Sequence, residues 1–328
     1  MPRSSRRPVA LLAALAAIAF GPGASAQAAH VQCGDVITQD TTLDSDLIDC
    51  PGDGIVIGAS GITLNLNSHL IDGAFRDPDN GVDNTGGYDH VTVENGTIRD
   101  FHYGVEFQYA DRGAISALRL VANSAGIFLA DSADGNLVER NVARQNGDGM
   151  FLLPIVYQEH TSVLEPQFNV IRRNEFSQNQ YGVWGFGSFT RMERNTINSN
   201  IESAIELVAG STGDLLAAND LAANGEGILV VGQSNNTTVE RNRIDGSASD
   251  GIQVGSAVLG TTVLAGNISN GNGDDGIDVD TTRADISRNT ANGNADLGIE
   301  AVPGVTDGGG NKARGNGDPA QCLNVSCK

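Results

Sequence analysis

Apolar and polar residues alternate over short stretches along most of the chain, and the stretches recur. Each opens with a small residue, followed by an apolar, a variable and usually a second apolar residue, as in 126–129 (Gly-Ile-Phe-Leu). Ten copies follow one another at intervals of 22 to 25 residues, apart from one interval of 33. Their opening residues are Gly81, Gly104, Gly126, Gly149, Gly182, Ala204, Gly227, Gly251, Gly276 and Gly298. A period of two predicts short strands with one buried and one exposed face.

A second pattern, an apolar residue followed two variable residues later by Asn, precedes most of these strands. Val138 to Asn141 and Ile171 to Asn174 are two of its seven copies. We expect these Asn side chains to stack from repeat to repeat and to hydrogen-bond along the stack and to turn backbone. Asn also tolerates the left-handed conformation that a tight corner needs.

The spacing of the strands limits the architecture. No helical pattern of about ten residues separates them, which excludes a Rossmann-like fold or an α/β barrel. An antiparallel sandwich or propeller and a parallel β-helix remain. A propeller repeat is nearer 40 to 45 residues, and the Asn stack favours the β-helix, in which equivalent residues lie ~4.8 Å apart.

Composition and charge narrow the class of partner. The 328 residues include 42 Gly, and 40 Asp and Glu stand against 20 Lys and Arg, a net charge of −20. An acidic chain argues against nucleic acid, which rewards basic patches, and against binding polyanions by charge alone.

Residues 1–26 read as a secretory signal. Arg3, Arg6 and Arg7 precede a short apolar run over 9–20, and residues 24–26 (Ala-Ser-Ala) form a cleavage site. The alternative is an uncleaved membrane anchor. Removing the segment leaves a mature charge of −23 and no apolar run long enough for a membrane span. We therefore expect a secreted or periplasmic protein.

Four cysteines lie near the two ends of the chain. In an oxidising compartment, an even number suggests disulfides. Pairing Cys33 with Cys50 and Cys322 with Cys327 closes the two shortest loops. Metal ligation is the alternative, but it lacks a C-x-x-C motif or a nearby pair of His.

Several segments resemble a known family. They include 33–38 (Cys-Gly-Asp-Val-Ile-Thr), 61–66 (Gly-Ile-Thr-Leu-Asn-Leu), 69–73 (His-Leu-Ile-Asp-Gly) and 91–98 (Val-Thr-Val-Glu-Asn-Gly-Thr-Ile). In these the chain resembles bacterial exported right-handed parallel β-helix repeat proteins of the pectate-lyase-like superfamily. The resemblance implies an all-β solenoid of about ten to eleven coils of 22–25 residues, with disulfide-containing end caps.

This plan divides the chain into consecutive parts. Residues 27–60 form an N-terminal cap with the first strands, residues 61–302 the β-helix with an insertion at 151–168, and residues 303–328 a Gly-rich cap or tail. A solenoid needs caps because its terminal coils leave the core open.

Function on such a rod depends on outward residues. The position two after each opening residue reads, in order, Asp83, Glu106, Phe128, Phe151, Trp184, Glu206, Leu229, Gln253, Asp278 and Glu300. We call this series the outward row. Phe128, Phe151 and Trp184 are contiguous in it, and Phe186 follows on the same face, so these four are candidate sugar-binding residues. The alternative is that the apolar insertion covers them.

Candidate catalytic residues lie in two places, the N-terminal coils and the insertion; the alternatives are a structural role for the first and a solvated loop for the second. Glu106 neighbours Asp83, and paired carboxylates can serve as acid and base. The insertion carries Glu159 and His160, which together with Glu206 form a second candidate acid–base set. A Lys base is disfavoured, because both mature lysines lie in the tail.

Asp278, Asp280 and Glu300 form a candidate Ca²⁺ site of hard oxygen ligands, with a solvated acidic face as the alternative. Asp274 and Asp275 are similar to the Asp pair of β-helical polygalacturonases, but the flanking motifs of that family are absent. Copper delivery is disfavoured because soft ligands are scarce. The Arg residues that recur before the corner Asn, alternating with Glu, predict a surface lattice of ion pairs.

The sequence therefore predicts an exported, monomeric β-helix that binds a polysaccharide. It leaves open whether the protein also cleaves or modifies that polysaccharide as a lyase or hydrolase. The competing hypothesis is a structural or adhesive surface rod without enzymatic activity.

Overall fold

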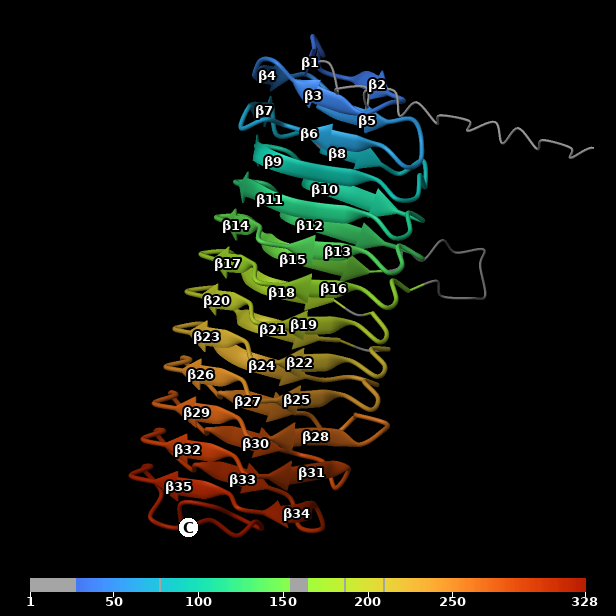
Figure 1. The fold of residues 1–328 in the computed structure, drawn as a ribbon. Coiled ribbons are helices and arrows are strands. Elements are labelled where there is room, and N and C mark those ends of the chain that lie inside the picture. The colour runs from blue at the N-terminus through green and yellow to red at the C-terminus, as the bar shows by residue number, and fades with distance from the viewer. Residues whose placement is uncertain (1–27, 77, 154–164, 186, 209) are drawn as a thin grey trace, which may run out of the picture.

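The computed structural model describes residues 28–76, 78–153, 165–185, 187–208 and 210–328. Their regular secondary structure is entirely β-strand, and every strand pairing found among them is parallel. Figure 1 shows the coils stacked in chain order, from the blue N-terminal end to the red C-terminal end. No helix in this part of the chain is long and apolar enough to cross a membrane. The predicted β-helix is confirmed.

Twelve coils each contribute one strand to a twelve-stranded sheet. Its strands are β2 (Asp35–Ile37), β5 (Ile55–Ile57), β8 (Asn80–Asn84), β10 (Tyr103–Gln108), β12 (Ala125–Ala130), β15 (Asp148–Leu153), β18 (Tyr181–Gly185), β21 (Ser203–Leu207), β24 (Glu226–Val230), β27 (Ile252–Val254), β30 (Ile277–Val279) and β33 (Ile299–Ala301).

A 23-stranded sheet forms the other faces in two rows. One row holds β1 (Ala28–Ala29), β3 (Thr41–Leu43), β6 (Thr63–Asn65), β13 (Leu137–Glu139), β16 (Val170–Arg172), β19 (Arg191–Glu193), β22 (Leu215–Ala217), β25 (Thr238–Glu240), β28 (Thr262–Ala265), β31 (Ala284–Ser287) and β34 (Thr306–Gly309). The other holds β4 (Leu47–Cys50), β7 (Leu70–Gly73), β14 (Val142–Arg144), β17 (Glu175–Ser177), β20 (Thr196–Asn198), β23 (Asp220–Ala222), β26 (Arg243–Asp245), β29 (Ile268–Asn270), β32 (Thr290–Asn292) and β35 (Lys312–Arg314). The long strands β9 (Thr92–Arg99) and β11 (Ala114–Val121) pair with both rows.

The count of ten to eleven coils is slightly too low. The first two coils use β2 and β5, which lie among residues predicted to form the cap. The repeat pattern does not identify β2, because Asp35 occupies the position at which later coils have an inward apolar residue. Asp35 pairs with Ile55 of the next coil and is exposed. A terminal coil has no neighbour on its outer side, so a polar residue is tolerated there.

The small residue that opens each repeat lies at or next to the start of a strand and is required by close packing between coils. A Cβ on Gly182 would lie 2.4 Å from both the backbone oxygen of Ala204 and Cγ2 of Ile197. Inside the coils, buried aliphatic residues and Phe101, Phe107 and Phe176 form one continuous core. The repeated Gly therefore lets successive coils approach at the spacing of paired strands.

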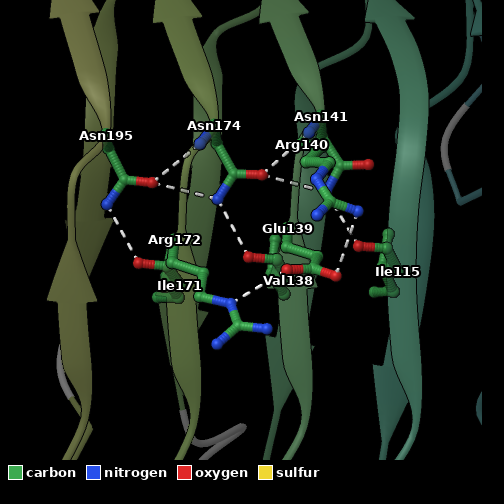
Figure 2. Close-up of polar contacts among 9 residues, drawn as sticks. All are labelled: Ile115, Val138, Glu139, Arg140, Asn141, Ile171, Arg172, Asn174 and Asn195. Atoms are coloured by element: carbon green, nitrogen blue, oxygen red, sulfur yellow. Dashed lines mark hydrogen bonds and ion pairs between the residues drawn. The ribbon is translucent and has the colours of Figure 1, made fainter.

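The predicted Asn stack is present and buried. The Asn141 side-chain amide donates to the Ile115 carbonyl at 2.8 Å and to Asn174 Oδ1 at 3.1 Å, and Asn174 repeats the pattern with Asn195 (Figure 2). The backbone N–H of each Asn also donates to the next amide oxygen. The stack consists of Asn141, Asn174, Asn195, Asn219, Asn242, Asn267, Asn289 and Asn311. We call this series the Asn ladder.

The left-handed corner, however, is not formed by the ladder Asn. The residue before it takes the positive φ, 56° at Arg140, 55° at Arg173 and 55° at Arg194. The Asn side chain instead satisfies the backbone groups that the corner leaves unpaired. Some of the recurrent Arg residues also form ion pairs with Glu, including Arg140 with Glu139 at 3.7 Å and Arg241 with Glu240.

Both ends carry the predicted disulfides, Cys33–Cys50 and Cys322–Cys327. At the C-terminal end, β34 and β35 continue the larger sheet, and Cys322 and Cys327 pack against the core. Isolated bridges join Cys322 to Ile299 and Cys327 to Asn311. The tail therefore closes this end of the rod.

Candidate functional site

The outward row lies on the twelve-stranded sheet in the predicted register. Glu106 pairs with Asp83 on one side and Phe128 on the other, and Phe151 lies between Phe128 and Trp184. Trp184 in turn neighbours Glu206. The spacing of the repeats thus brought together residues up to 33 positions apart.

The aromatic members of the row stack on one another. Ring centroids lie 4.8 Å apart between Phe128 and Phe151, at an interplanar angle of 15°, and 4.9 Å apart between Phe151 and Trp184. Tyr103 extends the stack, with its ring 4.5 Å from Phe128. We call Tyr103, Phe128, Phe151 and Trp184 the aromatic stack.

The stack is open only in part. Phe128 is 2 % exposed, so it presents almost no surface to a ligand. Phe151 and Trp184 are partly exposed. The expectation of a sugar-binding surface on all the rings is thus not met at Phe128, which supports its neighbours. Phe186 lies outside the described residues.

An open groove of about 500 Å³ runs beside the exposed end of the stack. Its walls come from successive coils, with Trp184 and Tyr181 from β18 and Asp148 from β15. The remaining lining residues are Phe75, Asn123, Ser124, Gly147 and Gln180. Tyr181 and Trp184 lie 6.2 Å apart between ring centroids. Aromatic faces beside polar groups suit a ligand that is apolar on one face and polar at its edges.

Asp148 and Tyr181 were missed as candidate site residues. Both belong to a second outward series, the residue just before each opening small residue, in which Tyr103, Ala125, Asp148 and Tyr181 are register neighbours. Asp148 follows Asn146 and Gly147, two residues typical of a turn, yet it begins β15. Reading the position before each Gly as a series would have found them.

The carboxylates near the groove are perturbed by burial. Burial, followed by the charge of Glu206, raises the pKa of Asp148 to about 6. Burial also raises the pKa of Tyr181, and the charges of Glu206, Glu202 and Asp148 add to the shift. Glu206 accepts a hydrogen bond from Ser203 Oγ at 3.3 Å.

Glu106 lies at the other end of the stack and is 6 % exposed. Asn80 Nδ2 donates to its Oε2 at 2.6 Å, and burial raises the pKa of Glu106 to about 7. Four strand spacings separate Glu106 from Glu206, about 19 Å. Two carboxylates that act on one glycosidic bond lie roughly 5 to 9.5 Å apart, so these two cannot form one acid–base pair. Glu159 and His160 lie outside the described residues.

The predicted calcium ligands are brought together in part. Asp278 and Glu300 are register neighbours, and with Asp275 they form a group whose carboxylate oxygens lie within 4.8 Å of one another. Asp280 follows β30, is exposed and is not in that group. Burial raises the pKa of Asp275 to about 7 and raises that of Asp278. Calcium at this site stays a prediction, with Asp275 in place of Asp280.

A family model decides the classification. The model described as periplasmic copper-binding protein (NosD) matches residues 33–228, well over half of the chain. The chain belongs to this family. A second model, described as right handed beta helix region, matches residues 155–318, which agrees with the resemblance inferred from the sequence. The two disulfides and the periplasmic family together support a location outside the cytoplasm.

Solved structures share the fold at low identity. The catalytic unit of an α-1,3-glucanase from Streptomyces thermodiastaticus has a TM-score of 0.59 and 17 % identity over 86 % of this chain, which spans only 62 % of that structure. The A-module of the mannuronan C-5 epimerase AlgE4 from Azotobacter vinelandii has a TM-score of 0.59 and 15 % identity, covering 90 % of this chain and 88 % of the module. A mutant of the periplasmic alginate epimerase AlgG has a TM-score of 0.57 and 15 % identity, covering 89 % and 73 %. No curated protein sequence matches the chain.

The described residues of this NosD family member do not fit copper. Copper favours thiolate, thioether and imidazole donors. Met150 and Met192 are buried in the core, and all four cysteines form disulfides. Within the described ranges, the clusters of three or more potential ligands consist of carboxylates alone. We therefore derive no step that involves copper.

Proposed function

We propose that this protein binds a polysaccharide along the groove beside Trp184. The observation that carries the proposal is the aromatic stack, which ends in partly exposed rings at an open groove. Sugar rings have apolar faces that pack on aromatic rings, and their hydroxyl groups would bond the polar lining at Gln180 and Asp148.

The shape of the site supports a long ligand. The outward row continues over ten coils at strand spacing, so successive sugar units can meet equivalent positions on successive coils. Solved structures with this fold include an α-1,3-glucanase, a mannuronan C-5 epimerase and a periplasmic alginate epimerase. The fold alone does not carry function, so the proposal depends on the groove and the rings.

A glycan array followed by calorimetry tests the proposal. Trp184→Ala removes the ring that borders the groove, and we expect at least tenfold weaker binding with an unchanged melting temperature. Phe189→Ala is the matched control, because Phe189 is an exposed aromatic residue outside the groove that stacks on Phe168. Unchanged glycan affinity in Trp184→Ala, or no glycan bound by the wild type, would contradict the proposal and favour a structural rod.

An assay for new reducing or unsaturated chain ends tests catalysis on any glycan that binds. If cleavage occurs, Asp148 and Glu206 are the candidate groups, because both carboxylates lie near Trp184 and act on one another electrostatically. Asp148→Asn is then expected to abolish cleavage while the glycan still binds.

A further inference from the structure

Among the described strands, Lys and Arg lie only on the larger sheet, whereas Asp and Glu lie on both sheets. The twelve strands of the smaller sheet contain eight carboxylates and no Lys or Arg. The eight are Asp35, Asp83, Glu106, Asp148, Glu206, Glu226, Asp278 and Glu300. The groove and the aromatic stack lie on this sheet.

The larger sheet carries the cations of the strands. They are Arg99, Arg119, Arg144, Arg172, Arg191, Arg243, Lys312 and Arg314. Several pair with acids of the same sheet, as Arg172 does with Glu139 at 2.9 Å and Arg191 with Glu193. None of the ion pairs found in the described part of the chain uses a carboxylate of the smaller sheet. The negative charge of the smaller sheet is therefore not neutralised by neighbouring cations.

This charge acts at the groove. Asp148 is the one charged residue among those that line it. Glu206 neighbours Trp184, and Glu202 joins Glu206 and Asp148 in raising the pKa of Tyr181, so the charges around the groove are negative. A concave site lined by charges of one sign concentrates ligands of the opposite sign. A sugar carboxylate would be repelled here, whereas an ammonium group would be attracted to the acids and to the aromatic faces.

We infer that the polysaccharide bound in this groove is an amino-sugar polymer with free amines, and that polyuronates are excluded. The inference rests on the proposed function, since it assigns a substrate class to the same site. The groove and the rings locate the ligand, and the carboxylates of the smaller sheet, which have no cation beside them in the described part of the chain, select its charge.

Three hexamers test the inference by calorimetry at about pH 6.5, where most of Asp148 is ionised and sugar amines still carry protons. Glucosamine and N-acetylglucosamine hexamers share a backbone and differ in charge, and a galacturonate hexamer supplies the opposite charge. We expect the glucosamine hexamer to bind about tenfold tighter than its acetylated counterpart, and the galacturonate hexamer at least tenfold weaker than either. The first difference should shrink in 0.5 M salt, where the charges are screened.

A variant pair locates the effect. Asp148→Asn removes one charge from the groove wall, and we expect the ratio of the glucosamine to the N-acetylglucosamine affinity to fall at least threefold. Asp220→Asn makes the same change at an exposed residue of β23 in the larger sheet, and it should leave the ratio unchanged. Using the ratio removes any general loss of binding from the comparison.

The outcomes separate this inference from the proposed function. If no hexamer and no arrayed glycan binds, the proposed function fails. If a glycan binds and depends on Trp184 but amines give no gain, or the galacturonate hexamer binds as tightly as the glucosamine hexamer, then only the amino-sugar inference is overturned.

Discussion

Two rings on one row can differ in exposure, as Phe128 and Trp184 do. Phe128 has rings on both sides, Tyr103 at 4.5 Å and Phe151 at 4.8 Å, and is buried between them. Trp184 ends the stack next to Glu206 and keeps part of its surface. The spacing of the repeats predicts that both residues point outward. It cannot predict their exposure, because the rings that cover Phe128 include Tyr103 from a second series.

Asp214 is an ionisable residue in a buried position. The Thr190 backbone N–H donates to its Oδ1 at 2.8 Å, as that of Gly113 donates to Asn136 Oδ1. Its Oδ2 is buried and has no hydrogen-bond partner, and the residue is only 2 % exposed. Burial raises the pKa of Asp214 to about 8. An Asp thus occupies a position where neutral Asn would serve.

We predict that Asp214→Asn stabilises the protein at alkaline pH. Because the folded pKa is raised, the contribution of Asp214 to stability is fully present below the unfolded pKa of about 4 and is lost as the pH rises through about 8. The variant lacks this loss, so its melting temperature should exceed that of the wild type at pH 8.5 and match it near pH 4. If the melting temperatures of the wild type and the variant differ by the same amount at both pH values, the raised pKa of Asp214 is contradicted.

At the scale of strands, much could be predicted, because register follows from counting residues between equivalent positions. Glu106, Phe128, Phe151 and Trp184 were placed on neighbouring strands in this way and lie so. Asp148 and Tyr181 were not, because each precedes the small residue and lies outside the alternating part of the strand. The repeat predicts no register for the insertion at 151–168, because the insertion interrupts the spacing from which register is counted.

The Asn ladder makes a test possible at this scale. Asn195 is 1 % exposed, donates to the Ile171 carbonyl at 2.9 Å and to Asn219 Oδ1 at 3.0 Å, and accepts bonds from Asn174. We predict that Asn195→Ala lowers the free energy of unfolding by about 3 kcal/mol, since it removes several bonds and leaves buried backbone groups unpaired. Chemical denaturation measures the change.

Asn198→Ala provides the control for the ladder. Asn198 lies in β20, three residues beyond Asn195, and its side-chain oxygen is buried without a hydrogen-bond partner. Its replacement is expected to cost much less than that of Asn195. Equal losses for the two variants would mean that the ladder contributes no more than any other Asn.

For the whole molecule, composition predicted shape better than activity. The Gly and Asn content reflects contacts between coils, while the net charge of −20 gains meaning only from its distribution over the two sheets. That distribution could not be predicted without knowing which strands share a sheet. At the C-terminal end it also leaves Asp275, Asp278 and Glu300 close together.

We predict that Ca²⁺ stabilises the C-terminal coils. Oxygen ligands that repel one another favour a bound divalent cation, so 1 mM Ca²⁺ at pH 7.5 should raise the melting temperature by a few degrees. Chelator should reverse the shift and Asp278→Asn should reduce it. A melting temperature that neither Ca²⁺ nor chelator moves would remove the calcium site.

Trp184 offers the most direct test of glycan binding, because it is the only Trp in the chain. Its intrinsic fluorescence reports on the groove mouth without interference from another indole. Titration with an oligosaccharide that the protein binds should shift the emission of Trp184 to shorter wavelength and protect Trp184 from a neutral quencher. Both changes should give the same dissociation constant as calorimetry. A glycan that binds with no change in the emission or quenching of Trp184 would contradict the account.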